Sequence, residues 1–371
     1  MNFHIREVRK HELPNILEDK AVWDNSFLIG TPHRLLAHLN NPKVGDDDIA
    51  LLITFLDNKI IGYMGIYIDH IYIGGEIQKI GWLSTWWLHP SAARKGIGKE
   101  MLKKMYDLNH GKIGVSQFTP SAKRVYDKSG YFYYLKKLEG CKIDLSFNLG
   151  YLLPAYRSYL KSMTPIFRFA DTVFNALNSV RLGKAYRLYE KSLEDISIDY
   201  LTYIDDKTRA FLSDKQKNNL TQRDGDFFQY IKTFQWIEEA PLLDLVNNNY
   251  SFSGYNQNFN IYLVKVENEN SEIIGFVSLL RKDHELKVLQ VFYENEKHPI
   301  IAKMIIMHGI KLKVKTIITY DEKISNEFKQ LKQSRIRYKK KTRESIISKA
   351  YGEIDYSKFD FQYGDGDCSF A

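Results

Sequence analysis

HPSAARKGIGKEML, residues 89–102, places two glycines and three Lys or Arg residues between an apolar run and a helical pattern. The run QKIGWLSTWWLH before it, residues 78–89, predicts a β-strand, and apolar residues then recur at helical spacing from 97 to 105. Gly96 and Gly98 leave backbone N–H groups accessible at the predicted helix start, where the helix dipole favours an anion. Full positive charges come from Arg94, Lys95 and Lys99. The turn therefore predicts a binding site for a diphosphate.

Two other glycine motifs that bind phosphates fit this turn poorly. A P-loop ends in Gly-Lys-Ser/Thr, and this turn lacks the hydroxyl that would bind Mg²⁺. A dinucleotide fingerprint needs a third glycine and an acidic residue about 20 positions further on. Neither pattern is present after residue 89.

The turn resembles the pyrophosphate loop of the GNAT superfamily of acetyl-CoA-dependent N-acetyltransferases, whose signature is Arg/Gln-x-x-Gly-x-Gly/Ala after a strand. Gly96 and Gly98 occupy the two glycine positions, and Ala93 occupies the leading Arg/Gln position, with Arg94 next to it. A second stretch, SAKRVYDKSGY at 121–131, resembles the family helix Ala-x-x-x-Tyr-x-x-x-Gly-Phe/Tyr. Its matching positions are Ala122, Tyr126, Gly130 and Tyr131.

The resemblance implies an α/β (α+β) fold with a mixed, mostly antiparallel GNAT sheet flanked by helices. The run EIIGFVSLLRKDH at 272–284 restates KIIGYMGIYIDH at 59–70, and similar elements follow each run in the same order. We therefore expect a duplicated fold with a degenerate second copy, similar in layout to Fem-type tandem proteins. The expected parts are a GNAT domain at 1–149, a helical connector at 150–192, a degenerate GNAT-like domain at 193–349 and a tail at 350–371.

The resemblance also implies roles for individual residues. The backbone N–H of Leu88 faces the thioester carbonyl, and Tyr126 protonates the leaving thiolate. The residues expected to bind acetyl-CoA are Leu88, Ala93, Arg94, Lys95, Gly96, Ile97, Gly98, Lys99, Thr119 and Tyr126.

A general base is not evident from the sequence, because GWLSTWWLH at 81–89 contains no carboxylate. The candidates are His89, Asp69, His70 and Glu76, or a water relayed through Ser84 or Thr85. The residues expected near the acceptor are Asp69, Ser84 and Trp86, the last as an apolar wall.

The second copy lacks the chemistry of the first. Its counterpart of the loop, YENEKHPIIAK at 293–303, has no glycine, and Phe328 at the position of Tyr126 has no proton to give. The basic run at 335–343 is typical of a solvated strand face. The tail QYGDGDCSFA at 362–371 contains two carboxylates, Asp365 and Asp367, which are too few for a metal site. We expect this tail to form a strand or turn that docks near the cleft.

Composition limits the remaining possibilities. The net charge of +8, from 53 basic and 45 acidic residues, is too mild to indicate nucleic acid. Two cysteines and the lack of an apolar run of membrane-spanning length predict a cytoplasmic protein with no membrane span. We expect transfer of an acetyl group from acetyl-CoA to a primary amine, on an amino sugar or nucleotide-linked amino sugar of a cell-surface polysaccharide pathway. A peptide acceptor, a non-catalytic CoA-binding scaffold and a Fem-like aminoacyl transferase are the alternatives.

Overall fold

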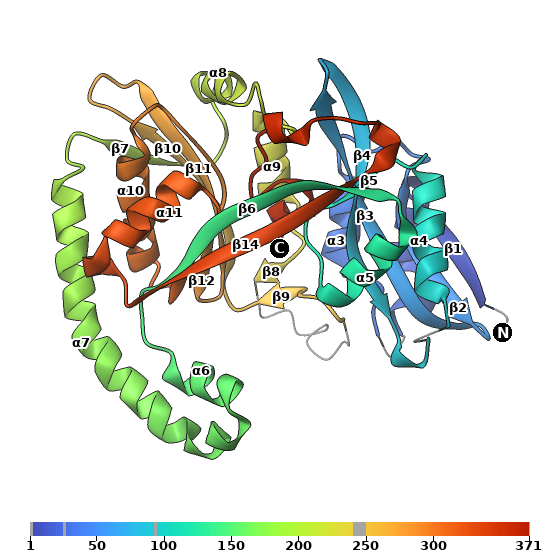
Figure 1. Cartoon of the computed structure of the whole chain (residues 1–371), viewed down its shortest axis with the longest axis horizontal. Coiled ribbons are helices and arrows are strands. Elements are labelled where there is room, and N and C mark those ends of the chain that lie inside the picture. Colours follow the sequence, from blue (N-terminus) through green and yellow to red (C-terminus); the bar gives the residue numbers. More distant parts are fainter. Residues whose placement is uncertain (1–2, 25–26, 93–94, 240–249, 371) are drawn as a thin grey trace. The chain divides into compact units, whose positions relative to one another are not determined.

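The structure of this 371-residue chain is a computed structural model, and it describes residues 3–24, 27–92, 95–239 and 250–370. The described chain divides into two compact units (Figure 1). The first unit comprises the chain up to Lys137, Tyr203–Phe259 and the chain from Arg343 onward. The second unit comprises Leu138–Thr202 and Asn260–Thr342.

The sheet of the first unit begins as an antiparallel meander. Its strands are β1 (Phe3–Arg9), β2 (Ile49–Leu56), β3 (Lys59–Ile73) and β4 (Glu76–Leu88). The short strand β5 (Ile113–Val115) then pairs with β4 in parallel orientation, which requires the crossover helix between them. The helix is α4 (Ile97–Leu108), which begins at the glycine turn as expected.

Helices cover both faces of this sheet. Successive strand residues point to opposite faces, and apolar residues on each face pack in a core of their own. Leu52 and Met64 pack in a core with α4 and Tyr126 of α5 (Pro120–Ser129), whereas Leu51 and Tyr63 pack in a second core. The second core is covered by α1 (Leu13–Glu18), α2 (Lys20–Trp23) and α3 (Pro32–Leu39). The later segments of this unit include α8 (Asp206–Lys215), α9 (Gly225–Thr233) and the 3₁₀ turn η7 (Gly366–Phe370).

The second unit repeats the order of elements. Its sheet contains β7 (Ser197–Leu201), β10 (Phe259–Glu267), β11 (Ile273–Lys282), β12 (Glu285–Tyr293) and β13 (Thr316–Thr319). Among the pairs of these strands whose register is described, only β12 and β13 are parallel. Helix α10 (His298–Lys311) connects these two strands, as α4 connects the parallel strands β4 and β5. Helix α11 (Glu322–Gln330) follows β13 as α5 follows β5. The expected mixed, mostly antiparallel sheet flanked by helices is confirmed.

The compact units differ from the expected contiguous parts because two long strands pass from one unit to the other. Strand β6 (Phe132–Asp144) follows α5, but its residues 141–144 pair with β13 in the second unit. Strand β14 (Arg337–Ser348) follows α11, but Ile346 and Ile347 pair with β5 in the first unit. The tail at 350–371 and the segment 203–259 consequently belong to the first unit.

The expected helical connector lies in the second unit. It consists of α6 (Leu149–Tyr156), the 3₁₀ segment η3 (Ser158–Met163) and the long helix α7 (Thr164–Lys191). Pro165 lies in the first turn of α7, where its missing N–H costs no helical hydrogen bond. Across the described residues, no helix combines the length and the apolar character needed to cross a membrane.

Candidate acyl-transfer site

Strands β4 and β5 diverge in the first unit. They pair only at Gly81–Ile113 and Trp82–Gly114, and β5 ends at Val115 while β4 continues to Leu88. Within the described sheet, the residues of β4 after Trp82 are therefore paired with β3 alone. Their backbone groups on the side of β5 are available to an extended ligand, which can add to an open strand edge.

A β-bulge at Thr85 changes which side chains of β4 face α4. The register with β3 passes from Met64–Trp86 to Gly65–Ser84, which leaves Thr85 without an opposite residue. Leu83 and Trp86 therefore both pack in the core of α4, while Ser84 faces α3. The indole nitrogen of Trp86 is buried and has no hydrogen-bond partner among the described residues.

The start of α4 offers uncapped backbone N–H groups. Gly96 is the N-cap with φ of 77°, and it has no side chain to accept from the first turn. A Cβ atom at Gly98 would lie 3.0 Å from Cζ2 of Trp86, so this glycine lets α4 approach β4 closely. Lys95 and Lys99 are exposed beside this turn, and Ile97 is buried in the core. The predicted residues Ala93 and Arg94 lie outside the described residues.

Tyr126 projects from α5 toward the same region. Its ring lies 5.7 Å from that of Trp86 and 5.4 Å from that of Phe132, and its side chain is buried. Burial raises the pKa of Tyr126 well above its usual range, and the nearby charge of Asp367 raises it further. Tyr126 is therefore a protonated phenol at neutral pH. The hydroxyl of the predicted residue Thr119 caps α5 by accepting from Ala122 N at 3.3 Å.

The other predicted residues occupy different surroundings. Ser84 accepts a hydrogen bond of 2.9 Å from buried Arg34, whose guanidinium lies 3.7 Å from the ring centroid of Trp236. His89 is exposed directly after β4, and its Nδ1 lies 2.7 Å from the hydroxyl of Ser91. His70 and Glu76 lie near the hairpin that joins β3 and β4, at the opposite end of β4 from Leu88.

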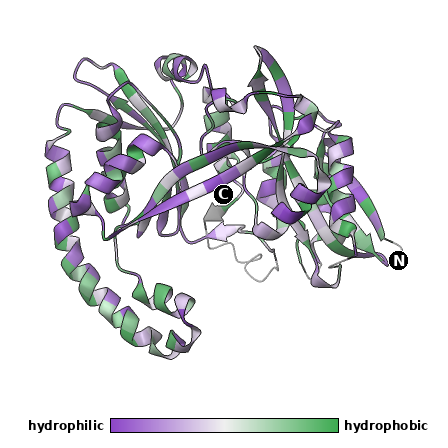
Figure 2. Ribbon diagram, viewed as in Figure 1, coloured by the Kyte–Doolittle hydropathy of each residue, from purple (hydrophilic) through white to green (hydrophobic). Residues whose placement is uncertain are grey.

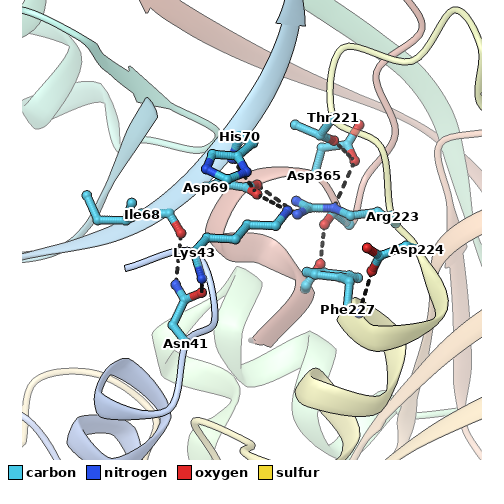
Figure 3. Close-up of polar contacts among 12 residues, drawn as sticks. Asn41, Lys43, Ile68, Asp69, His70, Thr221, Arg223, Asp224, Phe227 and Asp365 are labelled. Atoms are coloured by element: carbon cyan, nitrogen blue, oxygen red, sulfur yellow. Dashed lines mark hydrogen bonds and ion pairs between the residues drawn. The ribbon is translucent and has the colours of Figure 1, made fainter. Parts of the chain in front are cut away.

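Asp69 is fully buried in a network of ion pairs (Figure 3). Its Oδ1 accepts from Lys43 Nζ at 2.7 Å, and its Oδ2 lies 2.7 Å from Nη1 of Arg223. Burial alone would raise the pKa of Asp69, but the charges of Arg223 and Lys43 outweigh this effect and lower it to about 2. The carboxylate is thus stabilised in its charged form by internal partners, which opposes a role as a proton acceptor.

The same arginine holds the C-terminal tail in place. Nε of Arg223 lies 3.7 Å from Oδ1 of Asp365, which also accepts from the hydroxyl of Thr221 at 2.5 Å (Figure 3). The next residue, Gly366, has φ of 70°, and a Cβ there would lie 2.7 Å from Cβ of Ser116. Glycine thus allows the tail to touch the end of β5.

Asp367 is the carboxylate that the docked tail brings to the divergence of β4 and β5. It accepts a hydrogen bond from Ser116, which directly follows β5, and its side chain is only partly buried. Arg343 supports this arrangement by donating from Nε to the carbonyl of Ser116 at 2.9 Å. Burial raises the pKa of Asp367 more than Ser116, Arg343 and Arg34 lower it. The tail was expected near the cleft, but Asp367 was assigned no role there, since the sequence shows only a pair of acids beside glycines.

Residues 4–134 match the family model described as "Acetyltransferase (GNAT) domain". The match runs from β1 into β6 and includes the glycine turn and Tyr126. This part of the chain is a GNAT domain. The resemblance of the two sequence motifs is thereby confirmed, and GNAT domains in general bind acyl-CoA and transfer its acyl group. No curated protein sequence matches the chain.

Solved structures resemble the chain far beyond the GNAT domain. N-myristoyltransferase from Saccharomyces cerevisiae with bound myristoyl-CoA is 9% identical, covers 94% of this chain and 79% of its own, and has a TM-score of 0.53. GCN5-related N-acetyltransferases from Kribbella flavida and Anabaena variabilis are 10% and 9% identical, with TM-scores of 0.46 and 0.47. Each match covers 93% of this chain. It covers 70% of the Kribbella flavida chain and 72% of the Anabaena variabilis chain. At these identities, the likeness to the yeast enzyme concerns the fold alone.

Proposed function

We propose that this protein transfers an acetyl group from acetyl-CoA to a primary amine of a small acceptor in the cytoplasm. An amino sugar or a nucleotide-linked amino sugar is the acceptor we favour. The observation that carries the proposal is the divergence of β4 from β5 directly beside the uncapped start of α4. An extended pantetheine arm fits along β4, and its diphosphate fits at the first turn of α4.

The residues around this divergence suit acyl-CoA both at the start of α4 and along the edge of β4. Lys95 and Lys99 add exposed positive charge at the helix start, where Gly96 leaves the backbone open. The open edge of β4 offers backbone groups up to Leu88, whose N–H we assign to the thioester carbonyl. When bound, acetyl-CoA supplies an activated thioester. One preorganised donor to its carbonyl oxygen contributes about 3 kcal/mol to transition-state stabilisation.

Tyr126 serves as the general acid in this proposal. It is buried, protonated at neutral pH and packed beside Trp86 of β4. Its phenol donates a proton to the sulfur as the carbon–sulfur bond breaks, which avoids release of a bare thiolate. The unpaired indole N–H of Trp86 is a further donor for a polar atom of the bound ligands.

Asp367 serves as the general base. It lies at the end of β5, near enough to Tyr126 for its charge to raise the pKa of the phenol. Asp367 accepts the proton that the acceptor nitrogen loses as that nitrogen bonds to the carbonyl carbon. A raised pKa suits this task, because a carboxylate with an ordinary pKa is a weaker base at neutral pH.

Calorimetric titration with acetyl-CoA tests the cofactor assignment. We expect a micromolar dissociation constant for the parent, about −8 kcal/mol, and at least tenfold weaker binding for Lys95→Glu/Lys99→Glu. Lys103→Glu, one turn further along α4, is the matched control and should bind nearly as well as the parent. Gly98→Glu is unsuitable, because its side chain would collide with Trp86. Absence of binding to the parent would overturn the proposal.

Release of CoA in the presence of an amine panel tests the reaction. The panel includes glucosamine, a nucleotide-linked amino sugar, free amino acids and short peptides. We expect acetyl-CoA to turn over with an amino sugar, and myristoyl-CoA serves as the long-chain comparison. Tight binding of acetyl-CoA without CoA release from any acceptor would instead indicate a CoA-binding protein that does not catalyse transfer.

A further inference from the structure

The connector of the second unit, residues 149–191, exposes an unusual amount of apolar surface. Eleven of the nineteen large hydrophobic side chains that are exposed among the described residues lie between 151 and 180. The most exposed are Tyr156 at 77%, Tyr159 at 73% and Phe169 at 72%. Figure 2 shows hydrophobic residues along α6 and the adjoining half of α7. Exposed apolar patches that are concentrated in this way mark surfaces that meet a partner.

The exposed residues of α7 form one stripe rather than a scatter. Ile166, Phe169, Val173, Leu177 and Val180 follow one another at spacings of three and four, which places them on one helix face. A different face of the helix carries its buried residues, which are Asn178, Ala185 and Tyr189. Helix α7 thus has one face buried in the unit and a different, apolar face directed to solvent.

Basic residues continue the exposed stripe toward the end of α7. Lys184, Arg187 and Lys191 follow Val180 at the same helical spacing, and all three are exposed. The connector contains seven basic and two acidic residues, a formal charge of +5. One of the acids, Asp171, accepts hydrogen bonds from the backbone N–H groups of Leu149 and Gly150, so it is already engaged. The exposed face is therefore apolar at one end and positively charged at the other.

We propose that the connector docks on the surface of an anionic lipid bilayer. Apolar and aromatic side chains enter the interfacial region, and the basic residues pair with anionic headgroups, as in amphipathic segments that lie on membranes. Exposed tyrosines such as Tyr156 and Tyr159 suit the interface, because their rings are apolar and their hydroxyls stay hydrated. A second copy of this chain is disfavoured as the occupant, since two faces of this kind would bring positive charges together with few carboxylates to offset them. The proposal is independent of the proposed transferase function.

Flotation of the full-length protein with vesicles tests the proposal. We expect binding to vesicles of equal parts phosphatidylglycerol and phosphatidylcholine, and at least tenfold weaker binding to phosphatidylcholine alone. Raising sodium chloride from 50 to 500 mM should also weaken binding, because salt screens the headgroup charge. Equal binding to both vesicles, or none to either, would overturn the proposal.

Two pairs of variants assign the binding to the connector. Tyr159→Ser/Phe169→Ser/Leu177→Ser should lose at least tenfold in affinity, whereas Ile77→Ser/Tyr203→Ser, with similarly exposed apolar residues of the first unit, should bind as the parent does. Lys184→Gln/Arg187→Gln/Lys191→Gln should lose about a hundredfold, at about fivefold per basic residue. Its control is Lys339→Gln/Lys340→Gln/Lys341→Gln on β14.

Sedimentation equilibrium and circular dichroism complete the test. Because the substituted positions are exposed, we expect every variant to keep the circular dichroism spectrum of the parent. A loss of vesicle binding then reflects the changed surface of the connector rather than unfolding. Binding that the connector variants retain in full would overturn the proposal. Self-association of the parent that the serine variant abolishes, without vesicle binding, would also overturn it and identify a second copy as the partner.

Discussion

The hydroxyl of Ser116 donates a hydrogen bond to the carboxylate of Asp367, 251 positions further along the chain. Ser116 directly follows the short strand β5, so this contact fixes the tail at the point where β4 and β5 diverge. The tail is held there by Arg223, which lies between Asp69 of β3 and Asp365 of the tail. A buried ion network in the scaffold thus determines where a carboxylate of the candidate site lies.

Replacement of Asp367 by Asn should lower kcat by a factor of about 10² to 10⁴, because the acceptor amine then loses its base. The pKa of Asp367 is raised, chiefly by burial. In the parent, kcat/KM should therefore fall with decreasing pH at a value above the ordinary aspartate range, and this acid limb should be absent from any residual activity of the variant. The pH profile of CoA release measures both effects. Asp355→Asn, an exposed acid of the same tail, is the control. Full activity with an unchanged profile in Asp367→Asn would rule out the assigned role.

Replacement of Tyr126 by Phe should reduce kcat by about 10²-fold or more and leave acetyl-CoA affinity nearly unchanged. The phenylalanine keeps the ring contacts with Trp86 and Phe132 and removes only the acidic proton. Single-turnover kinetics and calorimetric titration separate the two quantities. Tyr131→Phe is a matched control, since its ring stacks on Tyr106 at 4.1 Å. Equal rates for both variants would contradict a role of Tyr126 as the acid.

Replacement of Arg223 by Leu should destabilise the first unit by about 3–5 kcal/mol, because Asp69 loses an ion-pair partner and Asp365 its nearest cation within the buried network. Urea unfolding followed by tryptophan fluorescence measures this unit selectively, since all five tryptophans lie in it. Lys123→Ala, which removes an exposed ion pair with Asp127, should cause no measurable change. Loss of the Arg223 network should also reduce activity by releasing the tail. A stable variant with a normal midpoint would show that the network contributes little.

The sequence predicted the local parts of this site and missed the parts that depend on distant pairing. The glycine turn, the start of α4 and the position of Tyr126 on α5 follow from spacing within about a dozen residues, and the structure places each of them as expected. The passage of β6 and β14 between units depends on pairings such as Ile346 with Val115, which no local pattern encodes. The structure shows that Thr119, which the resemblance assigns to cofactor binding, also caps α5 through its side chain.

The charged residues show the same limit. Asp69 looked suited to acceptor binding or to proton transfer because it ends an apolar strand near a histidine. Its partner Arg223 lies in a segment that was expected to belong to the second domain, so the buried ion pair was not foreseeable. Likewise, Asp367 and Ser116 are brought together only when the tail docks on the first unit.

The first unit should lose stability on acidification well above the pH at which Asp69 titrates, because of His38 on α3. His38 is buried, and desolvation together with the charge of Arg34 lowers its pKa to about 3. Since this value lies below that of the unfolded chain, the unfolded state binds more protons below about pH 6.5. The free energy of unfolding should therefore fall by up to about 1.4 kcal/mol per pH unit from pH 6.5 toward 4. Asp69, with a pKa of about 2, adds its own loss only below about pH 4.

The variant His38→Leu should flatten this dependence between pH 6 and 4, whatever its effect on absolute stability. Urea unfolding at each pH, followed by tryptophan fluorescence, measures the slope for the first unit. His4→Gln, at an exposed histidine of β1, should keep the parental slope. If His38→Leu keeps the parental slope, groups other than His38 must take up the protons on unfolding. That result would contradict the assigned role of the buried imidazole.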